Sequence, residues 1–107
     1  MASTLSAEFQ AAMFKIYQRV KAEAHHNASV FFHMLNERGG VATAKALINA
    51  PSPSDTYTKL WELNRLDLTV EAEVAENEQW LNLFSGDKIS RARERLAKYG
   101  YVPKVGR

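Results

Sequence analysis

The chain has 107 residues, of which 46% are hydrophobic and 24% charged, and its net charge is +2 at pH 7. These values are typical of one globular domain and exclude a wholly disordered chain. They also argue against a general nucleic-acid-binding protein, which carries a larger excess of lysine and arginine. The sequence has no cysteine, which excludes disulfides, thiolate catalysis and cysteine-ligated zinc.

The sequence shows no targeting or membrane signal. Its N-terminus, MASTLSAEFQ, lacks the basic and apolar regions of a signal peptide. No apolar run approaches the ~20 residues that span a bilayer. We therefore expect a cytoplasmic protein that does not enter a membrane.

Two helices are predicted at the start of the chain. The first has Ser6 as its N-cap and ends around residues 23–26. Its apolar residues recur at intervals of three and four, as on the buried face of an amphipathic helix: Phe9, Met13, Ile16 and Val20. Asn27 is expected to cap the second helix, which ends at the corner Gly39-Gly40 because glycine adopts the left-handed conformation at little cost.

The rest of the chain predicts shorter helices. One covers residues 41–48, one follows the turn-rich stretch APSPSDT, one carries the acidic residues, and a short helical turn holds Trp80 and Phe84. The last helix has an apolar stripe, and Tyr101 is placed to pack back on its end. The residues expected to cap or end these elements are Pro51, Asp55, Asn64, Asp67 or Thr69, Ser85 and Gly100.

No segment alternates between apolar and polar residues for long enough to indicate a strand. We therefore predict an all-α fold, a compact single-domain bundle of six to seven short helices. Its ordered core is expected to cover about residues 6–101, with residues 102–107 as a loose tail.

Charge is sorted along the sequence. Residues 65–79 contain five carboxylates and one arginine, whereas residues 80–107 contain seven basic and two acidic residues. The acidic residues are predicted to lie on a helix whose inward side chains are Val70 and Val74. They are candidates for a surface that binds a protein partner with a basic surface: Asp67, Glu71, Glu73, Glu76 and Glu78.

The last helix has a basic stripe that could contact phosphates. Its residues are Lys88, Arg91, Arg95 and Lys98. Cations near a helix C-terminus are also expected from the helix dipole alone, and no aromatic residues interleave to stack on bases. Nucleic-acid binding by this helix is therefore the alternative hypothesis.

The catalytic and metal-binding patterns in this sequence are incomplete. His25, His26 and His33 lie close in sequence, but there is no HExxH motif and no cysteine to complete a metal site. No serine belongs to a GxSxG motif. A helix-turn-helix over residues 28–49 is a weak alternative, because its second helix offers only Lys45 and Asn49 as base readers. We expect no enzyme activity, no metal site and no cofactor.

Several marker residues together resemble a known family. In chain order they are Gly39-Gly40, Ala44-Lys45 and Leu47, Leu60-Trp61, the segment RLDLTVE from Arg65 to Glu71, Trp80 with Leu83-Phe84, Ala92 to Leu96, and Tyr99 to Tyr101. They resemble a small helical domain of unknown function that occurs in bacterial and phage-borne proteins, alone or fused to nuclease-like proteins linked to defence. The resemblance covers about residues 10–101, and it brings no catalytic residues.

In its small size and its lack of cysteine the chain is also similar to anti-CRISPR proteins, which are compact, cysteine-poor and non-enzymatic inhibitors. The two resemblances imply a non-catalytic protein-binding module, and the second implies an inhibitor of a bacterial defence system encoded by a phage or mobile element. Such a module would act through charged surfaces.

Overall fold

The structure is a computed structural model that describes residues 4–104. Its elements are α1 (Thr4–Glu23), α2 (Ser29–Asn49), α3 (Asp55–Glu62), the 3₁₀ helix η1 (Leu66–Leu68), α4 (Val70–Glu76), the 3₁₀ helix η2 (Glu78–Leu83) and α5 (Gly86–Lys98). No strand occurs within residues 4–104. The predicted all-α, single-domain bundle is confirmed.

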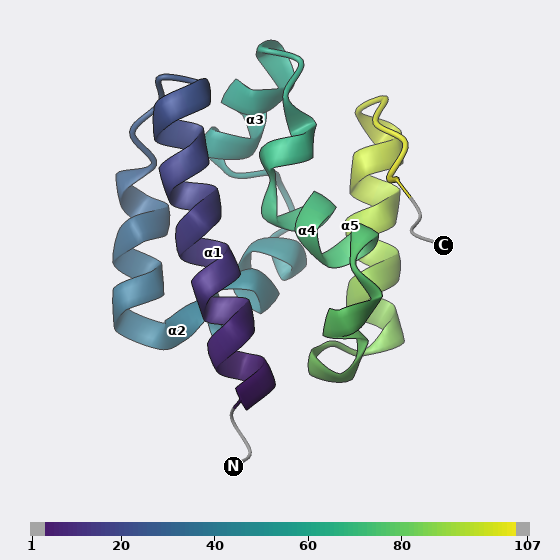
Figure 1. The fold of residues 1–107 in the computed structure, drawn as a ribbon. Helices are drawn as coiled ribbons and strands as arrows, with labels where there is room; N and C mark the ends of the chain where they lie inside the picture. The colour runs from purple at the N-terminus through teal and green to yellow at the C-terminus, as the bar shows by residue number, and fades with distance from the viewer. Residues whose placement is uncertain (1–3, 105–107) are drawn as a thin grey trace.

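The chain folds as a pair of long helices followed by a set of shorter ones (Figure 1). α1 and α2 pack against each other, and α4 lies between that pair and α5. The core is built from the predicted apolar face of α1, on which Phe9 contacts Trp80 and Phe84 edge to face, with ring centroids 5.1 and 5.2 Å apart. None of the described helices is long and apolar enough to cross a membrane.

The Gly39-Gly40 corner lies inside α2. Gly39 has φ 83° and ψ 171°, a conformation almost restricted to glycine. It divides α2 into a first arm, residues 29–38, and a second arm, residues 40–49. A Cβ at Gly40 would lie 2.8 Å from the Cα of Gln10 on α1. The second glycine therefore allows the two backbones to approach closely where the second arm crosses α1, behind it in the view of Figure 1.

Several predicted helix boundaries are confirmed. The Thr69 hydroxyl accepts a hydrogen bond from the Ala72 N–H at 3.1 Å and caps α4, and Ser85 caps α5 in the same way. Asn64 has a left-handed φ of 62° at the end of α3. At the end of α5, Gly100 has φ 85° and the Tyr101 N–H donates to the Leu96 carbonyl at 2.8 Å, as predicted.

Three predicted caps are wrong. α1 begins at Thr4, so Ser6 lies inside the helix. α2 begins at Ser29 and has no side-chain cap, because the chain turns sharply through residues 24–28 before the helix starts and Asn27 is not at its N-cap position. α3 is capped by Ser54, whose hydroxyl accepts from the Tyr57 N–H, and Asp55 is the first residue of that helix.

The predicted tail lies partly within the described residues. Val102 is 84% exposed, but the Lys104 N–H donates a hydrogen bond to Oε2 of Glu76 at 3.0 Å. This part of the tail is therefore held against α4. Residues 105–107 lie outside the described residues.

Candidate functional site

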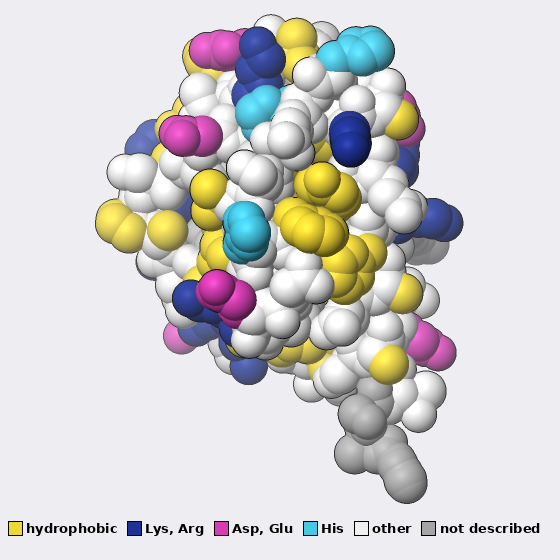
Figure 2. Space-filling view, turned by 90° about the vertical axis from the view of Figure 1, so that its left-hand side faces the viewer, with side chains coloured by type: hydrophobic (Ala, Val, Ile, Leu, Met, Phe, Trp, Pro, Cys, Tyr) yellow, Lys and Arg dark blue, Asp and Glu magenta, His cyan; other side chains and the backbone are white. Residues whose placement is uncertain are grey.

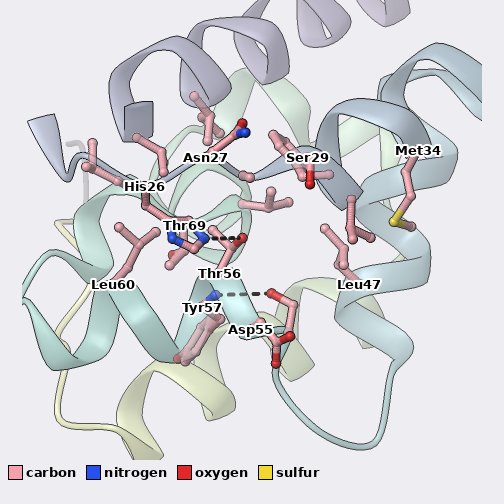
Figure 3. Close-up of a pocket in the computed structure, with 18 residues that line it drawn as sticks. His26, Asn27, Ser29, Met34, Leu47, Asp55, Thr56, Tyr57, Leu60 and Thr69 are labelled. Carbon is pink, nitrogen blue, oxygen red and sulfur yellow. Dashed lines mark hydrogen bonds between the residues drawn. The ribbon is translucent and has the colours of Figure 1, made fainter. Parts of the chain in front are cut away.

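A pocket of about 260 Å³ opens between the α1–α2 loop, the first arm of α2, the start of α3 and the segment from η1 to α4. In Figure 3 it is bounded by His26 and Asn27 on one side, by Asp55 and Tyr57 on the other, and by Met34 and Leu47. Its apolar wall comes from residues that lie far apart in sequence: Ile16, Val20, Phe31, Met34, Leu47, Leu60, Leu68 and Val70. We refer to it as the α2–α3 pocket.

The local sequence explains why the pocket forms there. His25 has a positive φ of 53°, which reverses the chain directly after α1. Ala24 and Ala28 bury only small side chains in the loop that follows. α3 packs on η1, and the space between α3 and the first arm of α2 forms the pocket.

Polar groups lie along the edge of the α2–α3 pocket. His26 Nε2 and the Thr56 hydroxyl oxygen are 3.2 Å apart and share a hydrogen bond whose direction depends on the histidine tautomer (Figure 3). Asp55 is exposed beside them. It is the one carboxylate among the lining residues, and none of these residues is a lysine or arginine. The pocket is therefore apolar inside and carries a negative charge at its mouth.

The surface beside the pocket is also rich in apolar side chains. Val30 lines the pocket and is 72% exposed. On the other flank of α2, the ring centroid of Phe32 lies 4.8 Å from that of Tyr17 and 6.2 Å from that of Phe14, and both of these residues are on α1. Figure 2 shows this side of the molecule, where hydrophobic side chains gather at the centre with histidines beside them.

Glu71, predicted to belong to an exposed acidic surface, lies inside the fold. It is only 4% exposed, and its Oε2 accepts a hydrogen bond from Nη1 of Arg95 at 3.1 Å. Burial raises the pKa of the Glu71 carboxyl, while its backbone hydrogen bond and Arg95 oppose this shift. The expectation that Glu71 faces a partner is therefore wrong, because α4 is covered by α5 on that side.

Three of the other acidic residues are also used within the fold. Glu73 Oε2 accepts from the Trp80 indole N–H at 2.8 Å, and Glu76 accepts from the Tyr101 hydroxyl. Asp67 pairs with Arg65 at 3.0 Å. Glu73, Glu76 and Asp67 are half-buried, whereas Glu78 is exposed on η2. Of the five predicted residues, only Glu78 is thus exposed.

The basic stripe of α5 is divided in a similar way. Arg95 donates to the carbonyls of Leu47 and Ala50, and Arg91 donates to those of Ile48 and Asn49. These carbonyls belong to the C-terminal turn of α2, where backbone carbonyl groups have no hydrogen-bond partner within the helix. The two arginines therefore close the end of α2, while Lys98 is exposed and Lys88 half-buried.

The three histidines do not converge. His25 and His33 are exposed, and His26 is bonded to Thr56. Within residues 4–104, no three histidine, aspartate or glutamate side chains are grouped so that they could hold a metal ion.

A separate charged network joins α1 to the segment before α4. Arg19 and Arg65 donate to Glu23 at 2.8 and 2.7 Å. These two hydrogen bonds, the Arg19 bond first, lower the pKa of the Glu23 carboxyl from 4.5 to about 2. Because the folded-state pKa lies below the unfolded value, the network stabilises the fold above about pH 4.5, and this contribution is lost as the pH falls towards 2.

We expect an NMR titration of the Glu23 side-chain carboxyl carbon to show a midpoint near 2. Arg19→Met should move this midpoint towards the ordinary value for glutamate, since it removes the hydrogen bond with the largest influence on the pKa. A wild-type midpoint near 4.5 would show that the network does not form in solution.

No protein-family model, curated protein or solved structure matched this chain. The resemblance to the helical domain of phage-borne and defence proteins therefore stays a prediction.

Proposed function

We propose that this chain is a non-catalytic protein-binding module whose main contact is the α2–α3 pocket. The observation that carries the proposal is the pocket itself, a space of about 260 Å³ with an apolar wall that opens to the surface. An apolar cavity of about 150 Å³ in a protein core is enough to bind benzene. The α2–α3 pocket can thus accommodate one leucine-sized or phenylalanine-sized side chain of a partner, which we call the anchor side chain.

The surroundings of the pocket support a protein partner. Interfaces gain most of their affinity from a few side chains that enter well-packed pockets, surrounded by contacts that exclude water. Val30 at the rim and the half-exposed Phe32 on the same helix provide apolar surface for such contacts. The acidic segment contributes less to this proposal than the sequence predicted, because most of its carboxylates bond within the fold.

The alternative of nucleic-acid binding by α5 loses support for a similar reason. Arg91 and Arg95 use their guanidinium groups on the carbonyls of α2. Within the predicted basic stripe, contact with phosphates would have to come chiefly from Lys88 and Lys98. A role in phage–host conflict depends on the resemblance alone and stays a prediction.

The proposal predicts that obstruction of the pocket removes partner binding. The partner would be identified by affinity purification from the native host, purified, and titrated against the chain by calorimetry. Ser29→Trp places a large side chain at the pocket mouth, whereas Ser90→Trp makes the same change on the exposed face of α5. We expect Ser29→Trp to weaken binding about thirtyfold or more, as for loss of an interface hot spot.

Ser90→Trp is the matched control and should bind as the wild type does. Glu78→Lys reverses the charge of the exposed acidic residue and should have a smaller effect than Ser29→Trp. Equal affinities for Ser29→Trp and Ser90→Trp, with unchanged helical circular dichroism, would contradict the proposal. A large loss with Glu78→Lys alone would return the binding surface to the acidic segment.

A further inference from the structure

We infer that the partner segment that enters the α2–α3 pocket carries an uncharged apolar anchor side chain with a lysine or arginine close beside it, and that Asp55 binds this cation. The inference rests on the proposed function and specifies the chemistry of the partner. It follows from the distribution of charge over the pocket wall.

The interior of the pocket selects an uncharged anchor. Its wall is formed mainly by aliphatic side chains together with Phe31 and the ring of Tyr57. No lysine or arginine is present there to neutralise an anion, and the one carboxylate lies at the edge. A charged group placed in such a space would lose its hydration without a partner, which is costly.

The mouth of the pocket selects a neighbouring cation. Asp55 is exposed at the start of α3 and pairs with no lysine or arginine within residues 4–104. Among the exposed carboxylates without a salt bridge in the described residues, Asp55 is the one that lines the α2–α3 pocket, whereas Glu23, Asp67 and Glu71 are paired within the fold. A lysine or arginine that follows the anchor side chain would find its counter-charge at the pocket edge, as expected for electrostatic complementarity between partners.

Asp55 also has a structural explanation. An aspartate in the first turn of a helix interacts favourably with the helix dipole, and α5 carries Asp87 in its own first turn. Asp87 is exposed and does not line the α2–α3 pocket. Asp87→Asn is therefore a matched control for Asp55→Asn, since both remove one carboxylate from the first turn of a helix.

The test uses three small molecules that share a phenyl ring and differ in charge: phenethylammonium, 2-phenylethanol and 3-phenylpropanoate. Each is titrated into the ¹⁵N-labelled protein at low salt, and the dissociation constant is measured from the shifts of amide signals of residues that line the pocket. We expect the cation to bind about three- to tenfold more tightly than the alcohol, and the anion to bind most weakly. Added salt should reduce these differences.

Asp55→Asn should abolish the preference for the cation and leave the affinity for the alcohol unchanged, while Asp87→Asn should retain the preference. If all three molecules bind at the pocket with equal affinity, or if Asp55→Asn has no effect, the inference fails and the proposed function stands. If none of them shifts the pocket signals, the pocket does not accept an apolar group and the proposed function fails as well. A concentration-dependent dimer that covers the pocket, seen by sedimentation, would also overturn the inference, because a second copy would then be the occupant.

Discussion

Arg95→Met is expected to lower the free energy of unfolding by about 3–5 kcal/mol, the usual cost of breaking a buried ion pair on one side. Arg95 and Glu71 have side chains that are only 11% and 5% exposed. The substitution leaves the Glu71 carboxylate buried without its counter-charge. It also removes the hydrogen bonds that close the C-terminal end of α2. Urea denaturation followed by circular dichroism measures the loss.

Two further variants separate the contribution of the ion pair from the effect of replacing any arginine on α5 with methionine. Arg93→Met, on an exposed position of α5, should change stability by less than about 0.5 kcal/mol. The double variant Glu71→Met/Arg95→Met should recover part of the loss, since it leaves no lone buried charge. If Arg95→Met is no less stable than Arg93→Met, the ion pair does not support the fold.

The loss in Arg95→Met should also depend on pH. Without the arginine, only the backbone hydrogen bond of Glu71 still opposes the effect of burial, so the folded-state pKa of Glu71 rises further above the unfolded value. Protonated Glu71 is then favoured in the folded state, so this contribution stabilises the fold at low pH and is lost as the pH rises through the folded-state pKa. The difference from wild type should therefore be larger at pH 7 than near pH 4, which is close to the ordinary pKa of glutamate, about 4.3.

Phe9→Ala is expected to have an effect of similar size, about 3–5 kcal/mol, because it removes a fully buried ring and leaves a cavity. Phe9 is 0% exposed and contacts the rings of Trp80 and Phe84. The loss should detach η2 from α1. In a Trp61→Phe background, Trp80 is the one remaining tryptophan, and its fluorescence should shift to the red before the helices unfold.

Phe14→Ala provides the comparison for Phe9→Ala. Phe14 lies on the same helix, is half-buried and contacts Phe32 at the surface. We expect its removal to cost less than half as much as the removal of Phe9. Equal losses for the two variants would mean that the contact between α1 and η2 is not the centre of the core.

Sequence patterns predicted the fold because most helices here are determined by local chemistry. The spacing of Phe9, Met13, Ile16 and Val20 fixes the buried face of α1, and all four are buried. Gly39 and Gly100 have the positive φ values that their positions predicted. The serine and threonine caps of α4 and α5 act within one turn of the chain. The predicted cap at Asn27 failed because the preceding loop, shaped by tertiary packing, shifts the helix start.

The candidate site was harder to predict because it depends on contacts between distant segments. Glu71 follows Val70 on a helix that is buried on several sides, and its partner Arg95 lies 24 residues further along the chain. A helix that packs on two neighbours leaves little room for an outward acidic face. The α2–α3 pocket could not be predicted from sequence spacing, since its wall combines residues from Ile16 to Val70.

The sorted charge of the sequence thus has mainly a structural role. The acidic segment binds α5, the C-terminal segment and Trp80, and the basic helix closes the end of α2. We propose that a partner binds instead at the surface around the α2–α3 pocket, with the negative charge of Asp55 at its mouth. In this assignment, the paired carboxylates and arginines stabilise the fold, and the residues around the pocket bind the partner.

Amide hydrogen exchange measured with and without the purified partner tests this assignment most directly. We predict that the partner slows exchange in residues 26–34 and 54–57, the segments that contain most of the residues lining the pocket, and leaves exchange in residues 71–78 of α4 and η2 unchanged. Protection confined to residues 71–78, with exchange around the pocket unaltered, would contradict the account and return the binding site to the acidic segment.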